Sequence, residues 1–183
     1  MWAESVSDPG VAGERDRPAP PEDPDSVAAA EEVALRILRG AAQSAGALQR
    51  RLCRRGFSEE AATTATAAMV RYGYVDDVAL ATSLAARSQR SGHGHIRVAA
   101  QLRARGIDDN AVAATLAVVD PDAERAAALA LGSRLWGRVT NGQLAQVRRR
   151  RVFGQLRSRG FDVETVHWVL RQLDTRNPTN HPD

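Results

Sequence analysis

The chain has 183 residues and a net charge of +3 at pH 7, and arginine supplies all 25 of its basic residues. Its single cysteine excludes an internal disulfide and suits a reducing cytoplasm, where Cys53 is expected to be a small, at least half-buried hydrophobe. No apolar stretch approaches the roughly 20 residues of a membrane span, and the first ten residues lack the basic and apolar segments of a secretory signal.

Residues 1–28 are expected to form a disordered acidic tail. They hold five prolines and seven acidic residues against two arginines, with no apolar periodicity. Such a segment buries too little surface to offset the entropy cost of ordering it. Because the tail is acidic, the rest of the chain is more basic than the total charge suggests. The last residues, 175–183, are expected to be a frayed end.

Three nearly identical stretches lie between these ends: QRRLCRRGF at 49–57, QLRARGI at 101–107 and QLRSRGF at 155–161. In each, a leucine stands four residues before a glycine, an arginine directly before it and an apolar residue directly after it. Serine or aspartate, which favour the N-cap of a helix, follows one residue later. We interpret each stretch as a corner between two helices, with the glycine in the left-handed conformation that ends the first one.

A further helix is expected ahead of each corner, because apolar residues there recur at helical spacing. These helices are predicted at 30–40, 77–90 and 121–136. The sequence GYVDD at 73–77 indicates another glycine stop, with Asp76 as the next N-cap, and Pro121 occupies the first position of its helix.

This recurrence predicts an all-α fold of three tandem three-helix repeats. Stacked end to end, they would form an elongated, curved, solenoid-like body behind the disordered N-terminal tail. The repeats are expected at 29–72, 73–119 and 120–174.

No pattern of catalytic or metal-binding residues stands out. His93 and His95 form an H-x-H pair in a glycine loop, but no second cluster of cysteine or histidine lies near them in the sequence. The acidic pairs at 59–60 and 76–77 begin helices, where negative charge suits the helix dipole. A chain without lysine also lacks the phosphate-binding loop that needs one. We therefore expect a non-enzymatic protein with no cofactor and no metal site.

Arginines are the remaining candidates for function. Cations at helix C-termini complement the helix dipole, but the run RRRR at 148–151 lies near the start of its helix, where they do not. We expect a basic surface whose partner is either nucleic-acid phosphate or an acidic protein groove. Its candidate residues are Arg54, Arg55, Arg97, Arg103, Arg105, Arg148, Arg149, Arg150, Arg151, Arg157 and Arg159.

A helix-turn-helix reader of the DNA major groove is not favoured. In such proteins the helix after the turn carries basic or amide side chains early. Here the helices after the corners begin with SEEA, DDNA and DVET, whose acidic ends phosphate would repel.

The stretch GYVDDVALATSLAARSQRSGHGHIRVAAQLRARGI at 73–107 resembles the centre of the RecX family, bacterial regulators of the RecA recombinase. The flanking LQRRLCRRGFSEE and RRRRVFGQLRSRGFD resemble the first and third repeats of that family, so the resemblance covers about 30–174. Two departures are Leu80, where relatives commonly have phenylalanine, and His95, where a basic residue is common.

The resemblance implies a cytoplasmic, monomeric regulator that binds RecA, typically the RecA filament on single-stranded DNA. It would restrain the ATPase, strand-exchange and coprotease activities of RecA in DNA repair and the SOS response. The alternative is a direct, charge-driven DNA-binding module without RecA specificity. A third reading is a helical-repeat scaffold whose basic face has no role.

Overall fold

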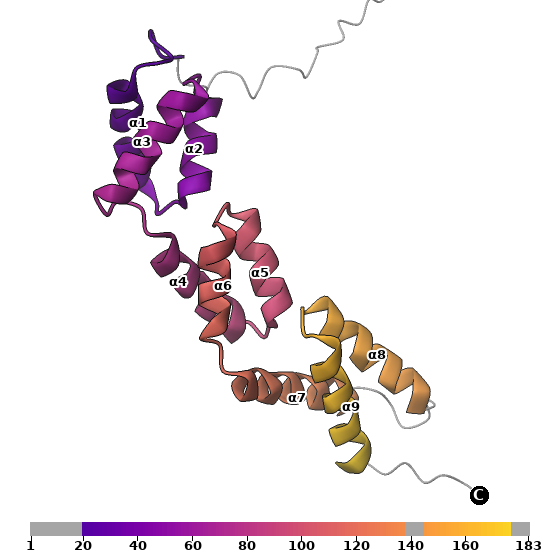
Figure 1. The fold of residues 1–183 in the computed structure, drawn as a ribbon. Helices are drawn as coiled ribbons and strands as arrows, with labels where there is room; N and C mark the ends of the chain where they lie inside the picture. The colour runs from indigo at the N-terminus through magenta and orange to yellow at the C-terminus, as the bar shows by residue number, and fades with distance from the viewer. Residues whose placement is uncertain (1–19, 138–144, 177–183) are drawn as a thin grey trace, which may run out of the picture. The chain divides into compact units, whose positions relative to one another are not determined.

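The computed structural model describes residues 20–137 and 145–176, and within these ranges it contains nine α-helices and no strand (Figure 1). The all-α prediction is therefore confirmed. The helices are α1 (Val27–Gly40), α2 (Ala45–Arg54), α3 (Glu59–Arg71), α4 (Asp77–Arg90), α5 (His95–Ala104), α6 (Asp109–Ala117), α7 (Pro121–Gly137), α8 (Ala145–Ser158) and α9 (Val163–Arg176).

Two compact units make up the described chain: the first holds α1 to α3 and the second holds α4 to α9. In the first unit, α1 packs on α3. In the second unit, α4, α5 and α6 contact one another, and α7, α8 and α9 form another mutually packed set. This grouping in threes is consistent with the predicted repeats, whose boundaries and stacking into a solenoid stay predictions.

All three predicted corners end their helices by one mechanism. Gly56, Gly106 and Gly160 have φ angles of 100°, 78° and 86°, in the left-handed region that favours glycine. At each corner the glycine N–H donates to the carbonyl three residues earlier. The N–H of the next, apolar residue donates to the leucine carbonyl five residues earlier, at 3.2–3.3 Å. These two bonds define the Schellman motif, so the predicted helix endings are confirmed.

The same motif ends α3 and α4. Gly73 and Gly92 both have a φ of 75°, and the N–H groups of Tyr74 and His93 donate to carbonyls five residues earlier. The stop at Gly73 was predicted from GYVDD, and Asp76 caps α4 as expected by accepting from the Ala79 N–H at 2.9 Å.

Short polar side chains start the helices after the corners. The Ser58 hydroxyl accepts from the Ala61 N–H at 3.3 Å, and the Asp108 carboxylate accepts from the Ala111 N–H at 3.1 Å. Asp162 accepts from the Thr165 N–H at 2.8 Å. Each cap satisfies a backbone donor that the helix leaves unpaired, which stabilises the helix by about 1 kcal/mol.

Each corner also contributes the same four positions to a hydrophobic core. These are the leucine, the apolar residue four positions before it, the residue directly after the glycine and the one five positions further on. All twelve side chains are at most 5% exposed. They are Leu48, Leu52, Phe57, Ala62, Val98, Leu102, Ile107, Val112, Val152, Leu156, Phe161 and Val166.

Two expectations require correction. The tail was predicted to extend to residue 28, but α1 begins at Val27, and the Pro24 carbonyl accepts from the Ser58 N–H at 2.9 Å. Pro20 and Pro21 also lie beside Gly56, so this proline-rich segment contacts the first corner instead of belonging to a structureless tail. Cys53 is exposed, not buried, because it lies on the solvent side of α2. The rest of the predicted tail, 1–19, and the end, 177–183, lie outside the described residues.

Candidate partner-binding surface

In the first unit, three arginines line one pocket of about 320 Å³. Arg36 comes from α1, Arg51 from α2 and Arg55 from the first corner, and Ile37, Gly40 and Ala41 complete the lining without an acidic residue. None of the three arginines forms an ion pair with a described residue. Guanidinium groups gathered in this way, with their donors unsatisfied by carboxylates, favour an anion such as phosphate or a carboxylate.

Only Arg55 of this pocket belongs to the predicted set. Arg51 lies in the same basic phrase, and its place on α2 follows from the predicted helix. Arg36 was missed, because it reaches the pocket from α1 and nothing local in the sequence pairs α1 with the first corner.

In the second unit, three predicted arginines bind backbone carbonyls at helix ends. Arg97 Nη1 donates to the Ser158 carbonyl at 3.2 Å, and Arg159 Nη1 donates to the Ser91 carbonyl at 3.1 Å. Arg157 Nη1 donates to the Phe161 carbonyl at 2.9 Å. Basic side chains commonly satisfy such C-terminal carbonyls. These three side chains therefore stabilise the fold. Replacing one of them by an acidic residue would remove its hydrogen bond to the backbone as well as alter the surface charge.

Two other predicted arginines are paired with acids on the surface. Arg103 Nε lies 2.7 Å from Asp109, and both side chains are more than half exposed. Arg149 pairs with Asp174 across α8 and α9. Exposed ion pairs of this kind stabilise a protein by about 0–1 kcal/mol, but they reduce the positive charge offered to a partner.

The remaining predicted arginines are the most available to a partner. Four of them are exposed, and their guanidinium groups form no hydrogen bond or ion pair with any described residue: Arg54, Arg105, Arg150 and Arg151. Arg148, in the same run, is half-buried. The two on α8 are sequence neighbours, so their unneutralised charges lie close together.

The repeated arginine before each corner glycine does not have one common environment. Arg105 is exposed, whereas Arg55 lines the pocket in the first unit and Arg159 binds the Ser91 carbonyl. Sequence equivalence predicts the backbone position of these residues correctly. It does not predict which of them a partner can reach.

The glycine loop between α4 and α5 packs directly on the third corner. The Gly94 N–H donates to the Arg159 carbonyl at 3.0 Å, and the Ile96 N–H donates to the Gly160 carbonyl at 3.1 Å. A methyl group added at Gly94 would lie 2.5 Å from the Gly160 carbonyl oxygen. Because this oxygen belongs to the backbone, no side-chain rotation can relieve the clash. The loop therefore joins the two helix sets of the second unit, and the third corner supplies the acceptor for the Ile96 N–H in the first turn of α5.

The two histidines of this loop face different groups. His93 Nδ1 lies 3.0 Å from the Ser88 hydroxyl. Burial, followed by the charges of Arg97 and Arg159, lowers the pKa of His93 below its usual 6.5. His95 instead lies beside two acids of the third helix set.

His95 meets Glu124 of α7 and Asp162 of the third corner. Its Nδ1 is 3.0 Å from Glu124 Oε1, and its backbone N–H donates to the same oxygen at 2.9 Å. Burial by itself would raise the pKa of Asp162, but hydrogen bonds from Thr165 and the charge of His95 lower it below the usual 3.8. This grouping could not be predicted from the sequence, because its members lie in three separate elements.

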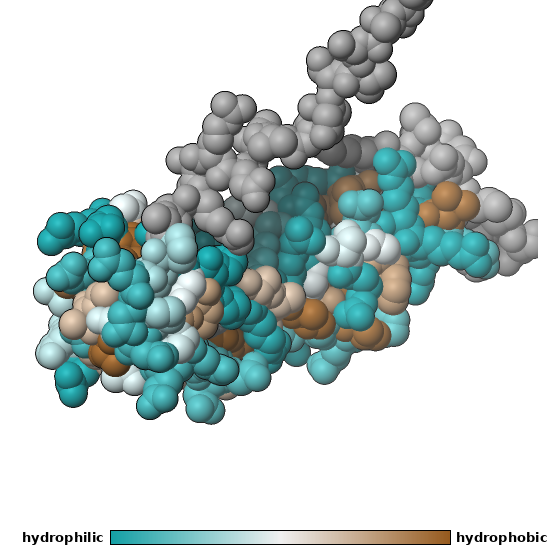
Figure 2. Space-filling view, turned by 90° about the horizontal axis from the view of Figure 1, so that it is seen from above, coloured by the Kyte–Doolittle hydropathy of each residue, from teal (hydrophilic) through white to brown (hydrophobic). Residues whose placement is uncertain are grey.

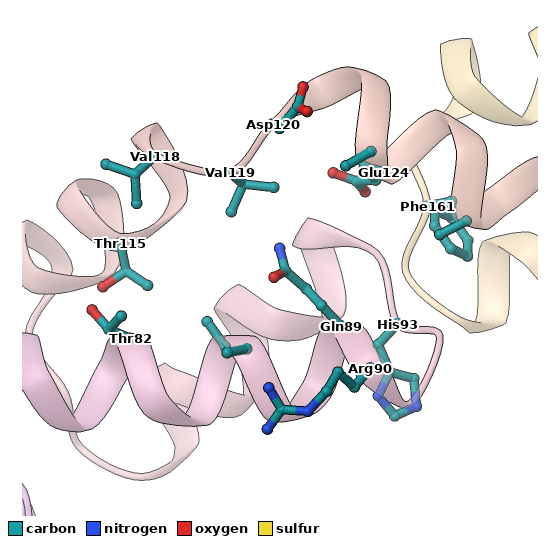
Figure 3. Close-up of a pocket in the computed structure, with 14 residues that line it drawn as sticks. Thr82, Gln89, Arg90, His93, Thr115, Val118, Val119, Asp120, Glu124 and Phe161 are labelled. Atoms are coloured by element: carbon teal, nitrogen blue, oxygen red, sulfur yellow. The ribbon is translucent and has the colours of Figure 1, made fainter.

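A groove of about 460 Å³ also opens in the second unit (Figure 3). Its lining is mostly apolar, with Arg90 and His93 on one side and Asp120 and Glu124 on the α7 side. Val118, which belongs to this lining, is 79% exposed. Such a groove can receive an apolar side chain of a partner. On the face drawn in Figure 2, hydrophobic residues appear in small groups among hydrophilic ones.

No family model matches the chain. The protein named "Regulatory protein RecX" from Stenotrophomonas maltophilia (strain R551-3) is 33% identical over 138 residues, covering 75% of this chain and 83% of that protein. The protein of the same name from Thermobifida fusca (strain YX) is 32% identical over 150 residues, covering 81% and 80%.

Among solved structures, the crystal structure of RecX from Lactobacillus salivarius is similar to this fold with a TM-score of 0.73 and 17% identity. The similarity covers 81% of this chain and 97% of that one, which supports the fold. None of the helices that the structure describes is long and apolar enough to cross a bilayer. Because relatives above 30% identity are matched over most of their length, the chain belongs to the RecX family of regulatory proteins.

Proposed function

We propose that this chain is a non-enzymatic regulator that binds the RecA filament on single-stranded DNA. In the cytoplasm, as a monomer, it restrains the ATPase, strand-exchange and coprotease activities of RecA during DNA repair and the SOS response. Family membership supports a regulatory role, because the relatives bear the name of regulatory proteins. The choice of RecA rests on the resemblance in the sequence.

The observation that carries this proposal is the set of exposed arginines without a carboxylate partner: Arg54, Arg105, Arg150 and Arg151. A protein filament wound on DNA offers both phosphates and acidic side chains to such cations. We propose that the helical repeats lie in the filament groove and contact neighbouring RecA subunits. They would then block access of DNA or repressor, or the addition of subunits.

The test is the DNA-dependent ATPase of RecA with increasing amounts of this protein. The wild-type protein should inhibit it near one protein per few RecA subunits, and the double variant Arg150→Glu/Arg151→Glu should lose most of that inhibition. The matched control is Arg87→Glu/Arg134→Glu, which reverses two exposed arginines outside the predicted set. An untouched ATPase at stoichiometric excess of wild-type protein contradicts the proposal.

The second candidate is a direct DNA-binding module, and the arginine pocket of Arg36, Arg51 and Arg55 is the observation that favours it. Binding to phosphate alone should weaken by orders of magnitude as the salt concentration rises, because counterions are released on binding. Binding to RecA itself would include apolar contacts, so it should persist at the higher salt concentration. Co-sedimentation with RecA–DNA filaments and with bare DNA, at 50 and 200 mM salt, separates the two.

A further inference from the structure

Three potential metal ligands converge where the two helix sets of the second unit meet. His95 is the first residue of α5, Glu124 lies in the first turn of α7, and Asp162 is the N-cap of α9. One ligand atom from each lies within 4.8 Å of the other two, and all three residues are half-buried. Ligands supplied by three elements can hold an ion that no single element could hold.

The distances suit a small divalent cation. His95 Nδ1 lies 3.0 Å and 3.2 Å from the two oxygens of Glu124. Two ligands of a tetrahedral ion with bonds of about 2.0–2.1 Å are separated by roughly 3.3 Å, so these two groups need to move little. A pocket of about 260 Å³ adjoins the cluster, lined also by Pro121 and Thr165, and leaves room for a water ligand.

The charges of the cluster favour a cation as well. The two carboxylates outweigh the single imidazole whether its ring is neutral or protonated. The Glu124 side chain is only 13% exposed, so water solvates it poorly. Arg125 lines the same pocket, but its ion pairs are with Asp122 at 3.7 Å and Glu164 at 3.5 Å.

Helix capping explains part of this arrangement and leaves the ligand atoms available. Glu124 accepts from the His95 N–H, and the two oxygens of Asp162 accept from the N–H and the hydroxyl of Thr165. Each carboxylate oxygen has two lone pairs, so an oxygen that accepts one hydrogen bond can still bind a metal ion.

We propose that His95 Nδ1, Glu124 and Asp162 form a binding site for a first-row divalent transition metal, with zinc or manganese as its occupant. An imidazole combined with carboxylates suits these ions better than magnesium or calcium, which prefer oxygen ligands alone. On binding, a protonated His95 ring releases one proton to solvent and a neutral ring keeps its single proton on Nε2, so Nδ1 coordinates the ion as a neutral imidazole nitrogen, and water completes the coordination. The ion joins the start of α5 to α7 and the third corner, a role that goes beyond the proposed regulation of RecA.

The first experiment titrates zinc into the chelator-treated full-length protein by calorimetry at neutral pH. One ion should bind per wild-type chain. In Glu124→Gln, the new amide oxygen still accepts from the His95 N–H, and in Asp162→Asn the helix keeps a favourable N-cap. Both variants lose an anionic ligand, so their affinity should fall by about 100-fold while their circular dichroism stays that of wild type.

The matched controls are His167→Ala and Cys53→Ser, which remove other potential zinc ligands at exposed positions. Both should bind zinc as the wild-type protein does. Absence of binding to the wild-type chain overturns the proposal. So does unchanged affinity in the two cluster variants, which would assign the ion to an adventitious position.

A second measurement needs no variant. Substoichiometric manganese added to the wild-type protein should broaden the amide NMR signals of His95, Glu124 and Asp162 before those of His167, because paramagnetic broadening falls steeply with distance. Broadening that begins elsewhere, or that is uniform along the chain, contradicts the site.

Discussion

Replacing Gly94 by alanine should open the contact between the glycine loop and the third corner. Gly94 has a φ of −80°, which any residue adopts, so backbone strain plays no part in the expected effect. The obstacle is steric, because the new methyl group would lie 2.5 Å from the Gly160 oxygen, 2.6 Å from its carbonyl carbon and 2.7 Å from the Phe161 Cα. Backbone atoms cannot rotate away as a flexible side chain can.

The size of the effect follows from what must separate. Overpacking of this kind costs about 1–3 kcal/mol. Two backbone hydrogen bonds cross the same contact, from Gly94 to Arg159 and from Ile96 to Gly160. Weakening each would add about 0.5–1.5 kcal/mol. We expect Gly94→Ala to lower the free energy of unfolding by about 2–6 kcal/mol.

The assay is urea denaturation followed by circular dichroism, with two glycine variants that isolate the causes. A methyl group at Gly154 meets nothing within 4 Å, and this glycine lies inside α8, so Gly154→Ala should stabilise the protein by about 0.5–1 kcal/mol. Gly73 also has open space but a φ of 75°, so Gly73→Ala should cost about 1–2 kcal/mol from strain alone. If Gly94→Ala unfolds at the wild-type urea concentration, the proposed packing of the loop on the third corner is wrong.

Three further predictions concern the core, the caps and the pH dependence. Leu102→Ala should lower the free energy of unfolding by about 2–5 kcal/mol, since Leu102 is 1% exposed in the core of α4–α6, and denaturant unfolding measures this loss. Asp162→Ala should cost about 1 kcal/mol of cap stability that Asp162→Asn largely keeps, so equal thermal melting temperatures of the two variants would count against the cap. His93 has a lowered pKa, so protonation opposes folding: its stabilising contribution is complete above pH 6.5 and is lost as the pH falls through the lowered value. His93→Gln should flatten that part of the pH–stability curve, and an unchanged slope would refute the assignment.

Most helix boundaries could be predicted because their causes are local. A glycine that needs a positive φ, an N-cap residue two positions later and a leucine one turn earlier are all read within about ten residues. The structure has each of these features at Gly56, Gly106 and Gly160. The expected start of the first helix was late by a few residues, because the proline-rich segment before it is ordered by contact with the first corner.

The candidate site was predicted less completely, because accessibility is a property of packing. The arginines at 150 and 151 are exposed as a basic surface requires, whereas Arg97 and Arg159 bind carbonyls in the opposite helix set. Residue type alone does not distinguish these two situations.

The amino-acid sequence by itself determined the helices, their caps and the three corners, since each depends on hydrogen bonds and contacts within a few residues. The tertiary structure alone decided which side chains meet across helix sets. Arg97 reaches Ser158 across 61 residues of chain, Arg159 reaches Ser91 across 68, and His95 meets Glu124 across 29. Such pairs depend on how separate helices pack, and no short-range pattern encodes that geometry.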